Sequence, residues 1–218
     1  MILLAIDTAT ESCSAALLVN GKVYQRTTLQ ARKHAELILP FVDELLTEAK
    51  IEKKDINGLV VGQGPGAFTG VRIGIGVAQG LALALNLPVV AVSNLKTLAF
   101  HAYQKLATKS KKNILVATDA RMKEVYWAKY EVFGANIVAL TAENVGAAKH
   151  IDTSAIDAYI GSGFHVYQPL MDYAKSHPML YATHVYSQSA DMLRMVKDDF
   201  ESLATNIDAI EPVYLREP

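Results

Sequence analysis

The sequence predicts an α/β fold built from two lobes, and three observations support this prediction. Segments typical of strands alternate with segments typical of helices along the 218 residues. A pattern of strand, aspartate, turn and strand occurs at 3–19 (LLAIDTATESCSAALLV) and returns at 114–130 (ILVATDARMKEVYWAKY). Between the copies, residues 105–113 (KLATKSKKN) are polar and lysine-rich, which is typical of a boundary. The alternative for the repeat is a chance recurrence of a common pattern. The alternative for the lysine-rich stretch is a plain solvated loop.

We therefore expect an N-terminal lobe at 1–108 and a C-terminal lobe at 109–218. The first lobe begins with short apolar runs at 2–6 and 14–19, which predict two strands. Asn20 and Gly21 then form a strong turn signal into a third strand, KVYQRTTL.

A change to helical spacing follows the third strand. From His34 to Ala49, apolar residues recur at positions i, i+3, i+4 and i+7, which predicts an amphipathic helix. Pro40 lies within this pattern and should kink the helix or place its start later. Residues 58–62 (GLVVG) predict a buried strand, the glycine-rich loop leads into a helix up to 85, and PVVAVS predicts another strand.

The second lobe shows fewer local signals. After the repeated strand pair, AYIGSG at 158–163 indicates a strand that enters a glycine turn. Residues 187–203 have helical spacing, with Ser187 or Ser189 as the expected N-cap.

Composition limits the classes of function. A net charge of −1 gives no general attraction to nucleic acid or lipid, so a partner should supply most phosphate contacts to any RNA. The single cysteine, Cys13, leaves no internal disulfide and favours a reducing compartment. The apolar N-terminus lacks a basic segment and meets Asp7 early, unlike a signal peptide. We expect a cytoplasmic protein.

The glycine-rich loop at 62–70 (GQGPGAFTG) does not have the composition of a nucleotide loop. It has no lysine for a Walker motif, and its glycine spacing differs from the dinucleotide fingerprint. Its amides could still bind an anion at the helix N-terminus, with Thr69 and Arg72 nearby.

The helix after this loop is apolar nearly all round. Its small residues form a ridge, with Gly70 four residues before Gly74 and Gly76 four before Gly80. Interior glycines cost helix stability, so several together suggest close approach by another backbone. The run is shorter than the roughly 20 residues of a membrane span. We therefore predict that one face packs on its own sheet and the other on a partner chain; the alternative is burial within its own domain.

Metal and nucleophile signals are weak. No two of the six histidines stand within four residues of each other, so no H-x3-H or HExxH pair is present. Cys13 is expected to be a small buried side chain. Asp7 and Asp119 end equivalent strands and could hold a phosphate–magnesium site, with Thr8 and Thr10 on one side and Arg121 and Lys123 on the other. The alternative is that both aspartates cap turns.

Four segments resemble one known family. AIDTATESCSAAL, GQGPGAFTGVRIGIGVAQGLAL, DARMKEVYW and PVYLR look like the TsaB (YeaZ) family, which takes part in making threonylcarbamoyladenosine in bacterial tRNA. The strand–Asp–turn–strand repeat also resembles the two-lobed actin-like fold of sugar kinases and Hsp70-type ATPases. This resemblance implies that each lobe has a mixed sheet with helices.

The resemblance implies a non-catalytic subunit that dimerises with TsaD, a catalytic paralogue that holds a metal through an H-x3-H motif. An ATPase, TsaE, joins the complex, so ATP or ADP and metal are expected on the partner subunits, no cofactor on this chain, and tRNA contact only through the complex. The same surface is expected to form a homodimer when the chain is alone. Carried onto this sequence, the interface comprises His34, Leu37, Ile38, Phe41, Leu45, Gly70, Val71, Ile73, Gly74, Ile75, Gly76 and Gly80.

The chain departs from the family pattern in two places. Ala67 stands where the family usually has serine, and little sequence follows PVYLR, where relatives often have a basic and aromatic tail. Asp7, Thr8, Thr10, Asp119 and Arg121 are then expected to be the remnant of a nucleotide or phosphate site. The rival hypotheses are a small ATPase or kinase that uses Asp7 and Asp119, which ATP turnover by the isolated chain would reveal, and a metalloprotease, which metal analysis would test.

Overall fold

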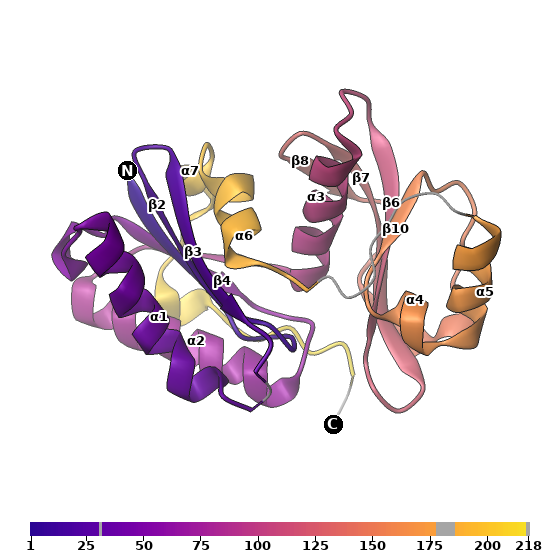
Figure 1. Cartoon of the computed structure of the whole chain (residues 1–218), viewed down its shortest axis with the longest axis horizontal. Helices are drawn as coiled ribbons and strands as arrows, with labels where there is room; N and C mark the ends of the chain where they lie inside the picture. The colour runs from indigo at the N-terminus through magenta and orange to yellow at the C-terminus, as the bar shows by residue number, and fades with distance from the viewer. Residues whose placement is uncertain (31, 178–185, 217–218) are drawn as a thin grey trace. The chain divides into compact units, whose positions relative to one another are not determined.

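The computed structural model describes residues 1–30, 32–177 and 186–216, and it divides into two compact units (Figure 1). Unit 1 comprises Met1–Asn94 and Ser187–Val213, and unit 2 comprises Leu95–Tyr186 and Tyr214–Pro218. Each unit contains one sheet with both parallel and antiparallel pairs, and helices accompany each sheet. The predicted two-lobed α/β architecture is confirmed.

The sheet of unit 1 has the strand order β3-β2-β1-β4-β5. Its strands are β1 (Ile2–Asp7), β2 (Cys13–Val19), β3 (Lys22–Thr28), β4 (Gly58–Gly62) and β5 (Val89–Val92). The first three form an antiparallel meander, and β4 and β5 run parallel to β1. The central strands β1, β2 and β4 are almost entirely buried, which requires cover on both faces of the sheet.

Helices from both ends of the sequence supply that cover (Figure 1). One face packs against α1 (His34–Ala49) and α2 (Phe68–Leu85), with η1 (Lys53–Asp55) after α1. The opposite face receives α6 (Ser189–Val196), followed by α7 (Phe200–Leu203), and the chain then returns to the first face, where η3 (Ile207–Ala209) packs beside α2.

Two local predictions about these helices need correction. The first helix starts at His34 with Pro40 inside it, so a later start is wrong, while a kink at Pro40 stays a prediction. The helix can include Pro40 because Glu36, whose carbonyl would meet the missing N–H, is exposed to water. In α6, neither serine caps the helix through its side chain: Gln188 is the N-cap residue, and the Ser189 hydroxyl donates instead to Ser14 O at 2.8 Å.

Unit 2 repeats the strand plan of unit 1. Its sheet has the order β10-β6-β7-β8, with β9 paired to β7. Strand β6 pairs antiparallel with β7 and parallel with β10, as β1 pairs with β2 and β4. The elements are α3 (Asn94–Leu106), β6 (Lys112–Asp119), β7 (Glu124–Phe133), β8 (Asn136–Ala139), β9 (Asn144–Ala147), η2 (Ala148–His150), β10 (Ala158–Ile160), α4 (Gly163–Val166) and α5 (Gln168–Ser176).

The equivalence of Asp7 and Asp119 is therefore confirmed at the level of topology. Asp7 is the last residue of β1 and Asp119 the last residue of β6, which are corresponding strands of the two sheets.

The boundary between the units differs from the expected division at 108/109. Unit 1 ends its first segment at Asn94, and residues 187–213, expected in the C-terminal lobe, belong to unit 1. The reason is burial, since Met192 and Leu193 of α6 are fully buried in unit 1 and Thr205 bridges to Val89 at the edge of its sheet. The lysine-rich stretch is only the connection from α3 to β6 inside unit 2.

Candidate functional site

The inner face of α2 touches the turn that follows β1. A Cβ added to Gly70 would lie 2.1 Å from Thr8 O, and one added to Gly66 would lie 2.2 Å from Ala9 O. The Thr8 hydroxyl donates to Gly70 O at 2.6 Å, and Ala67 N–H donates to Ala9 O at 2.7 Å. The glycine-rich loop thus allows close packing between two backbones of unit 1, and its amide at Ala67 already has a partner.

The outer face of α2 also has small residues, and described atoms of the chain do not pack against its glycines. Gly76 and Gly80 are exposed, and a Cβ added to either would meet no described atom within 4 Å. Phe68 and Leu83 on this face are 55% and 69% exposed, and the Arg72 guanidinium lies 3.7 Å from the Phe68 ring centroid. We call Phe68, Arg72, Ile73, Gly76, Gly80 and Leu83 the outer α2 face.

The structure divides the predicted interface residues into two groups. Gly76 and Gly80 are exposed, and His34, Leu37, Phe41 and Ile73 are partly exposed. The other six are buried in the core of unit 1, so they position the helices and cannot contact a partner: Ile38, Leu45, Gly70, Val71, Gly74 and Ile75. Their inclusion in the interface is corrected accordingly.

Helix α2 begins at Phe68, slightly before the expected start, which makes it 18 residues long. With 18 residues it is long and apolar enough to cross a membrane by length and composition alone. In unit 1, however, its residues Val71, Ile75 and Ala78 are buried against the sheet, as in the core helix of a globular domain.

Asp7 lies at the centre of a buried polar cluster in unit 1. Its side chain is fully buried; Ala9 N–H donates to Oδ1 at 3.0 Å, and Asn94 Nδ2 donates to Oδ1 at 3.0 Å and Oδ2 at 2.9 Å. Burial raises the pKa of Asp7 above its ordinary value, and the nearby Ser187 hydroxyl and the bonds from Ala9 and Asn94 oppose that rise. The Ser187 oxygen itself has no well-formed hydrogen bond to any described residue.

This cluster joins the points where the chain leaves and re-enters unit 1. Asn94 ends the first segment of the unit, and its side chain also accepts from Gly64 N–H at 2.8 Å. Ser187 begins the second segment, and Val213, which ends it, donates to Gln63 O at 2.8 Å. Neither Asn94 nor Ser187 was predicted to contact Asp7, and Ser187 was expected only as a helix N-cap. Asn94 stands two residues after β5, whose end lies at the same edge of the sheet as the end of β1.

Asp119 caps the corresponding turn in unit 2. Arg121 N–H donates to its Oδ1 at 2.8 Å, as Ala9 N–H does to Asp7, and the Tyr167 hydroxyl donates to the same oxygen at 2.6 Å. Burial and the bond to Asp119 raise the pKa of Tyr167 to about 12.

The remaining residues of the expected phosphate remnant also have local partners. The Thr10 hydroxyl accepts from Ser12 N–H at 3.3 Å, and Arg121, with a side chain 75% exposed, lies 3.1 Å from Asp119. The turn-cap interpretation accounts for the bonds from Ala9 and Arg121, while Asn94 and Tyr167 donate to the same carboxylates from distant parts of each unit.

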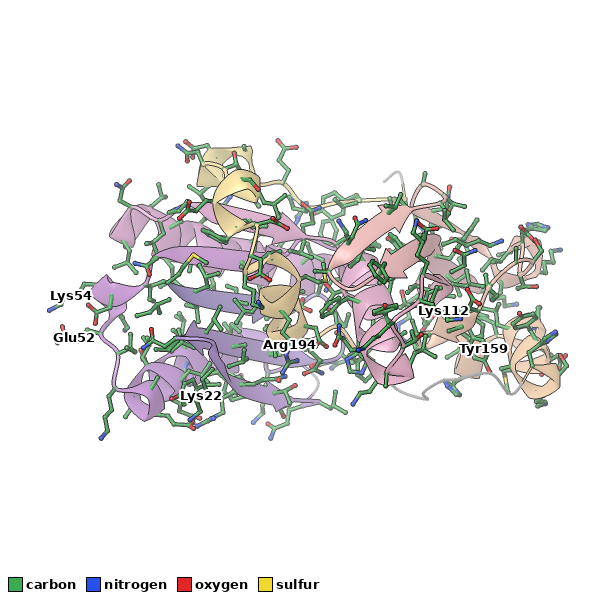
Figure 2. All side chains as sticks on the ribbon, turned by 90° about the horizontal axis from the view of Figure 1, so that it is seen from above. Lys22, Glu52, Lys54, Lys112, Tyr159 and Arg194 are labelled. Atoms are coloured by element: carbon green, nitrogen blue, oxygen red, sulfur yellow. The ribbon has the colours of Figure 1, made fainter. Side chains whose placement is uncertain are left out.

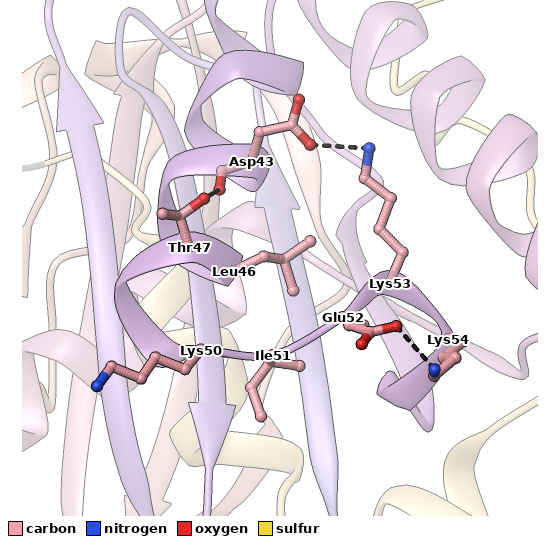
Figure 3. A pocket seen from close by; sticks show the side chains of 8 residues that line it. All are labelled: Asp43, Leu46, Thr47, Lys50, Ile51, Glu52, Lys53 and Lys54. Carbon is pink, nitrogen blue, oxygen red and sulfur yellow. Dashed lines mark hydrogen bonds and ion pairs between the residues drawn. The ribbon is translucent and has the colours of Figure 1, made fainter.

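Two further features bear on binding. A hollow of about 550 Å³ lies beside the end of α1 and is lined by residues from Asp43 to Lys54 (Figure 3). Two of its lysines are paired, Lys53 with Asp43 at 2.8 Å and Lys54 with Glu52 at 2.7 Å. Among the described residues, no group of three or more His, Cys, Asp or Glu side chains is placed to hold a metal ion; His184 lies outside them.

Comparisons with known proteins agree with this architecture. A family profile described as TsaD, tRNA N6-adenosine threonylcarbamoyltransferase, matches residues 25–211. The Escherichia coli tRNA threonylcarbamoyladenosine biosynthesis protein TsaB is 40% identical over 99% of this chain and 95% of its own length. The Haemophilus influenzae TsaB is 43% identical over 59% of this chain and 53% of its own.

A solved structure extends the match to the fold. YeaZ from Pseudomonas aeruginosa superimposes with a TM-score of 0.85 at 35% identity, over 98% of this chain and 99% of that one. A second Pseudomonas aeruginosa structure, described as an uncharacterized protein with similarity to peptidase YEAZ, gives the same TM-score and identity. The chain therefore belongs to the TsaB (YeaZ) family of tRNA threonylcarbamoyladenosine biosynthesis proteins.

Proposed function

We propose that this chain is a non-catalytic subunit of the tRNA threonylcarbamoyladenosine machinery that dimerises with TsaD through the outer α2 face. The observation that carries the proposal is the open ridge at Gly76 and Gly80, flanked by the exposed side chains of Phe68 and Leu83. Glycine at these positions gives up roughly 0.5–1 kcal/mol of helix stability each, and no packing inside unit 1 requires it. Close approach by a partner helix explains why both positions lack a side chain.

The adjoining part of α1 extends this surface. Leu37 and Phe41 stand four residues apart on one side of α1, and both are partly exposed while they pack on the unit 1 core. Removal of such apolar area from water contributes about 25 cal/mol per Å². A helix of TsaD that lies along both elements would therefore form a shared helical bundle.

The non-catalytic role is supported by the state of Asp7. Both of its carboxylate oxygens accept hydrogen bonds from unit 1, and the side chain is fully buried. An acid that is buried and bonded in this way holds the turn at Ala9 and the side chain of Asn94, which favours a structural role. In the proposed assembly, ATP or ADP and metal are held by TsaD and TsaE, and this cytoplasmic chain has no cofactor of its own.

The proposal is tested by substitutions of the two exposed glycines. Gly76→Leu and Gly80→Leu should leave the isolated chain folded, because their side chains enter open space. Each should reduce co-purification with TsaD at least tenfold, because the ridge is filled. The matched control is Gly146→Leu in β9 of unit 2, where an added Cβ also meets nothing within 4 Å.

Well-folded Gly76→Leu and Gly80→Leu variants that bind TsaD as the unsubstituted chain does would contradict the interface. ATP turnover by the isolated chain that Asp7→Ala abolishes would contradict the non-catalytic role. Light scattering of the chain alone gives a further check, since the same surface should form a homodimer that both leucine variants convert to monomer.

A further inference from the structure

Unit 2 has a shallow hollow beside the lysine-rich segment 105–112. The hollow, of about 350 Å³, lies between the end of α3, the turn that follows and the hairpin from β7 to β8, and Tyr103, Thr108, Lys109, Phe133 and Gly134 are among its lining residues. These elements belong to one unit, so the hollow does not depend on how the two units are arranged.

The charge of this segment is not balanced. Residues 105–112 contain four lysines and no acid. Lys111 pairs with Glu131 at 2.6 Å, and Lys112 on β6 (labelled in Figure 2) pairs with Asp157 at 3.4 Å. Lys105 and Lys109 are exposed, and neither has a carboxylate partner among the described residues. Lys109 lines the hollow, and Lys105 lies next to its lining residue Gln104, so two lysines without a described carboxylate partner flank it in a chain whose net charge is −1.

An exposed aromatic ring lies within the same hollow. Phe133, the last residue of β7, is 48% exposed, and Gly134 beside it has a positive φ of 62° that turns the chain away. Proteins that hold single-stranded nucleic acid combine lysines along the phosphate backbone with an aromatic face on which a base stacks. The hollow offers both groups in one place.

We propose that Lys105 and Lys109 bind RNA phosphates while Phe133 stacks against one unpaired base, so that unit 2 contacts tRNA directly. This inference rests on the function proposed above, and it replaces the expectation that tRNA is reached only through partner subunits. It uses no residue of the outer α2 face, so the two surfaces are separable by substitution.

The experiment measures binding of a fluorescently labelled tRNA, a substrate for threonylcarbamoylation, to the complex with TsaD and to the isolated chain, over a series of salt concentrations. Lys105→Glu/Lys109→Glu should weaken binding by about tenfold near physiological salt. Loss of two phosphate contacts should also lower the slope of log K against log salt by about 1.5. Phe133→Ala should weaken binding about fivefold and leave that slope unchanged.

The matched control is Lys149→Glu/Lys175→Glu, which makes the same change of charge elsewhere in unit 2 and should leave tRNA affinity within about twofold. Equal weakening by control and test variants, unchanged affinity of the test variants, or no tRNA binding by the complex and the chain would each overturn the proposal. If charge reversal instead breaks association with TsaD while the isolated chain binds tRNA normally, the hollow is a protein-docking surface and the proposal is overturned. If TsaD never associates with the chain, the proposed function fails, and the tRNA titration of the isolated chain still decides this inference.

Discussion

Asp7 shows how a carboxyl at the end of a central strand can be held by partners inside its own unit. Its carboxyl ends a central strand, as catalytic aspartates often do, yet Ala9 and Asn94 occupy both oxygens. Gly62 is required beside it, because an added Cβ would lie 2.6 Å from Oδ1. The residue type was predictable from the end of the strand, but its principal partner stands 87 residues away in the sequence.

The raised pKa of Asp7 predicts a pH-dependent contribution to stability. Below the ordinary value of 3.8, the carboxyl is neutral in both the folded and unfolded chains. As the pH rises through the higher pKa of the folded state, the folded chain must bury a charge that the unfolded chain exposes to water, so stability is lost. The Tm of the parent chain should therefore fall relative to the Tm of Asp7→Asn as the pH is raised from 4 to 8.

Asp152 supplies a control of opposite sign. The pKa of this exposed carboxyl is lowered by the Lys129 ammonium, which lies 2.7 Å away, and by Ser154. The contribution of the ionised Asp152 carboxylate to stability is present above its ordinary pKa and is lost as the pH falls. The parent chain should therefore lose its Tm advantage over Asp152→Asn in acid. Parallel pH profiles for the two variants would contradict these assignments.

At the scale of elements, α2 shows why a small-residue helix has two separate explanations. Gly70 and Gly74 are small because the turn at Thr8 lies against them, whereas Gly76 and Gly80 face away from unit 1. The sequence pattern treats all four alike, since helical spacing identifies small positions without showing which backbone approaches them. The packing of one face on the sheet of its own unit is confirmed, and a partner chain on the other face stays a prediction.

Alanine substitutions should separate these two roles. Gly80→Ala should stabilise the isolated chain by roughly 0.5–1 kcal/mol, because alanine favours the helix and its methyl group meets no atom. Gly70→Ala should destabilise it by about 1–3 kcal/mol or more, since Thr8 O lies 2.1 Å from the new Cβ. Urea unfolding of both variants measures the difference, and equal midpoints would show that the inner contact is not tight.

At the scale of the whole molecule, local patterns predicted the elements better than their grouping. The strand at 58–62 and the helix at 34–49 have the expected bounds, because the first is a continuous apolar run and the second has strong apolar periodicity. Helix α3 was not predicted, since NLKTLAFHAYQKL mixes apolar residues with lysine, histidine and glutamine. The return of 187–213 to unit 1 depends on burial against β1, β2 and β4, which no local pattern records.

A fragment test follows from this discontinuous unit. Residues 1–108 alone should not fold cooperatively, because the sheet face under α6 is uncovered, and full burial of a side chain such as Met192 or Leu193 contributes roughly 1.5–3 kcal/mol. Residues 1–94 joined to 187–213 by a linker of about six residues should fold, since Asn94 and Ser187 both lie beside Asp7. Circular dichroism during urea titration distinguishes the two, and a cooperative transition in 1–108 would refute the expectation.

The late return of the chain to unit 1 also has a consequence for biosynthesis. During translation at about 5–20 residues per second, roughly 6–24 s separate the emergence of Asn94 from that of Val213. For most of that interval the nascent sheet lacks the covering helix α6, because residues 95–186 of unit 2 must be made before α6 is. Chaperones that shield apolar surface at the ribosome should therefore engage the first-made half of this protein for longest.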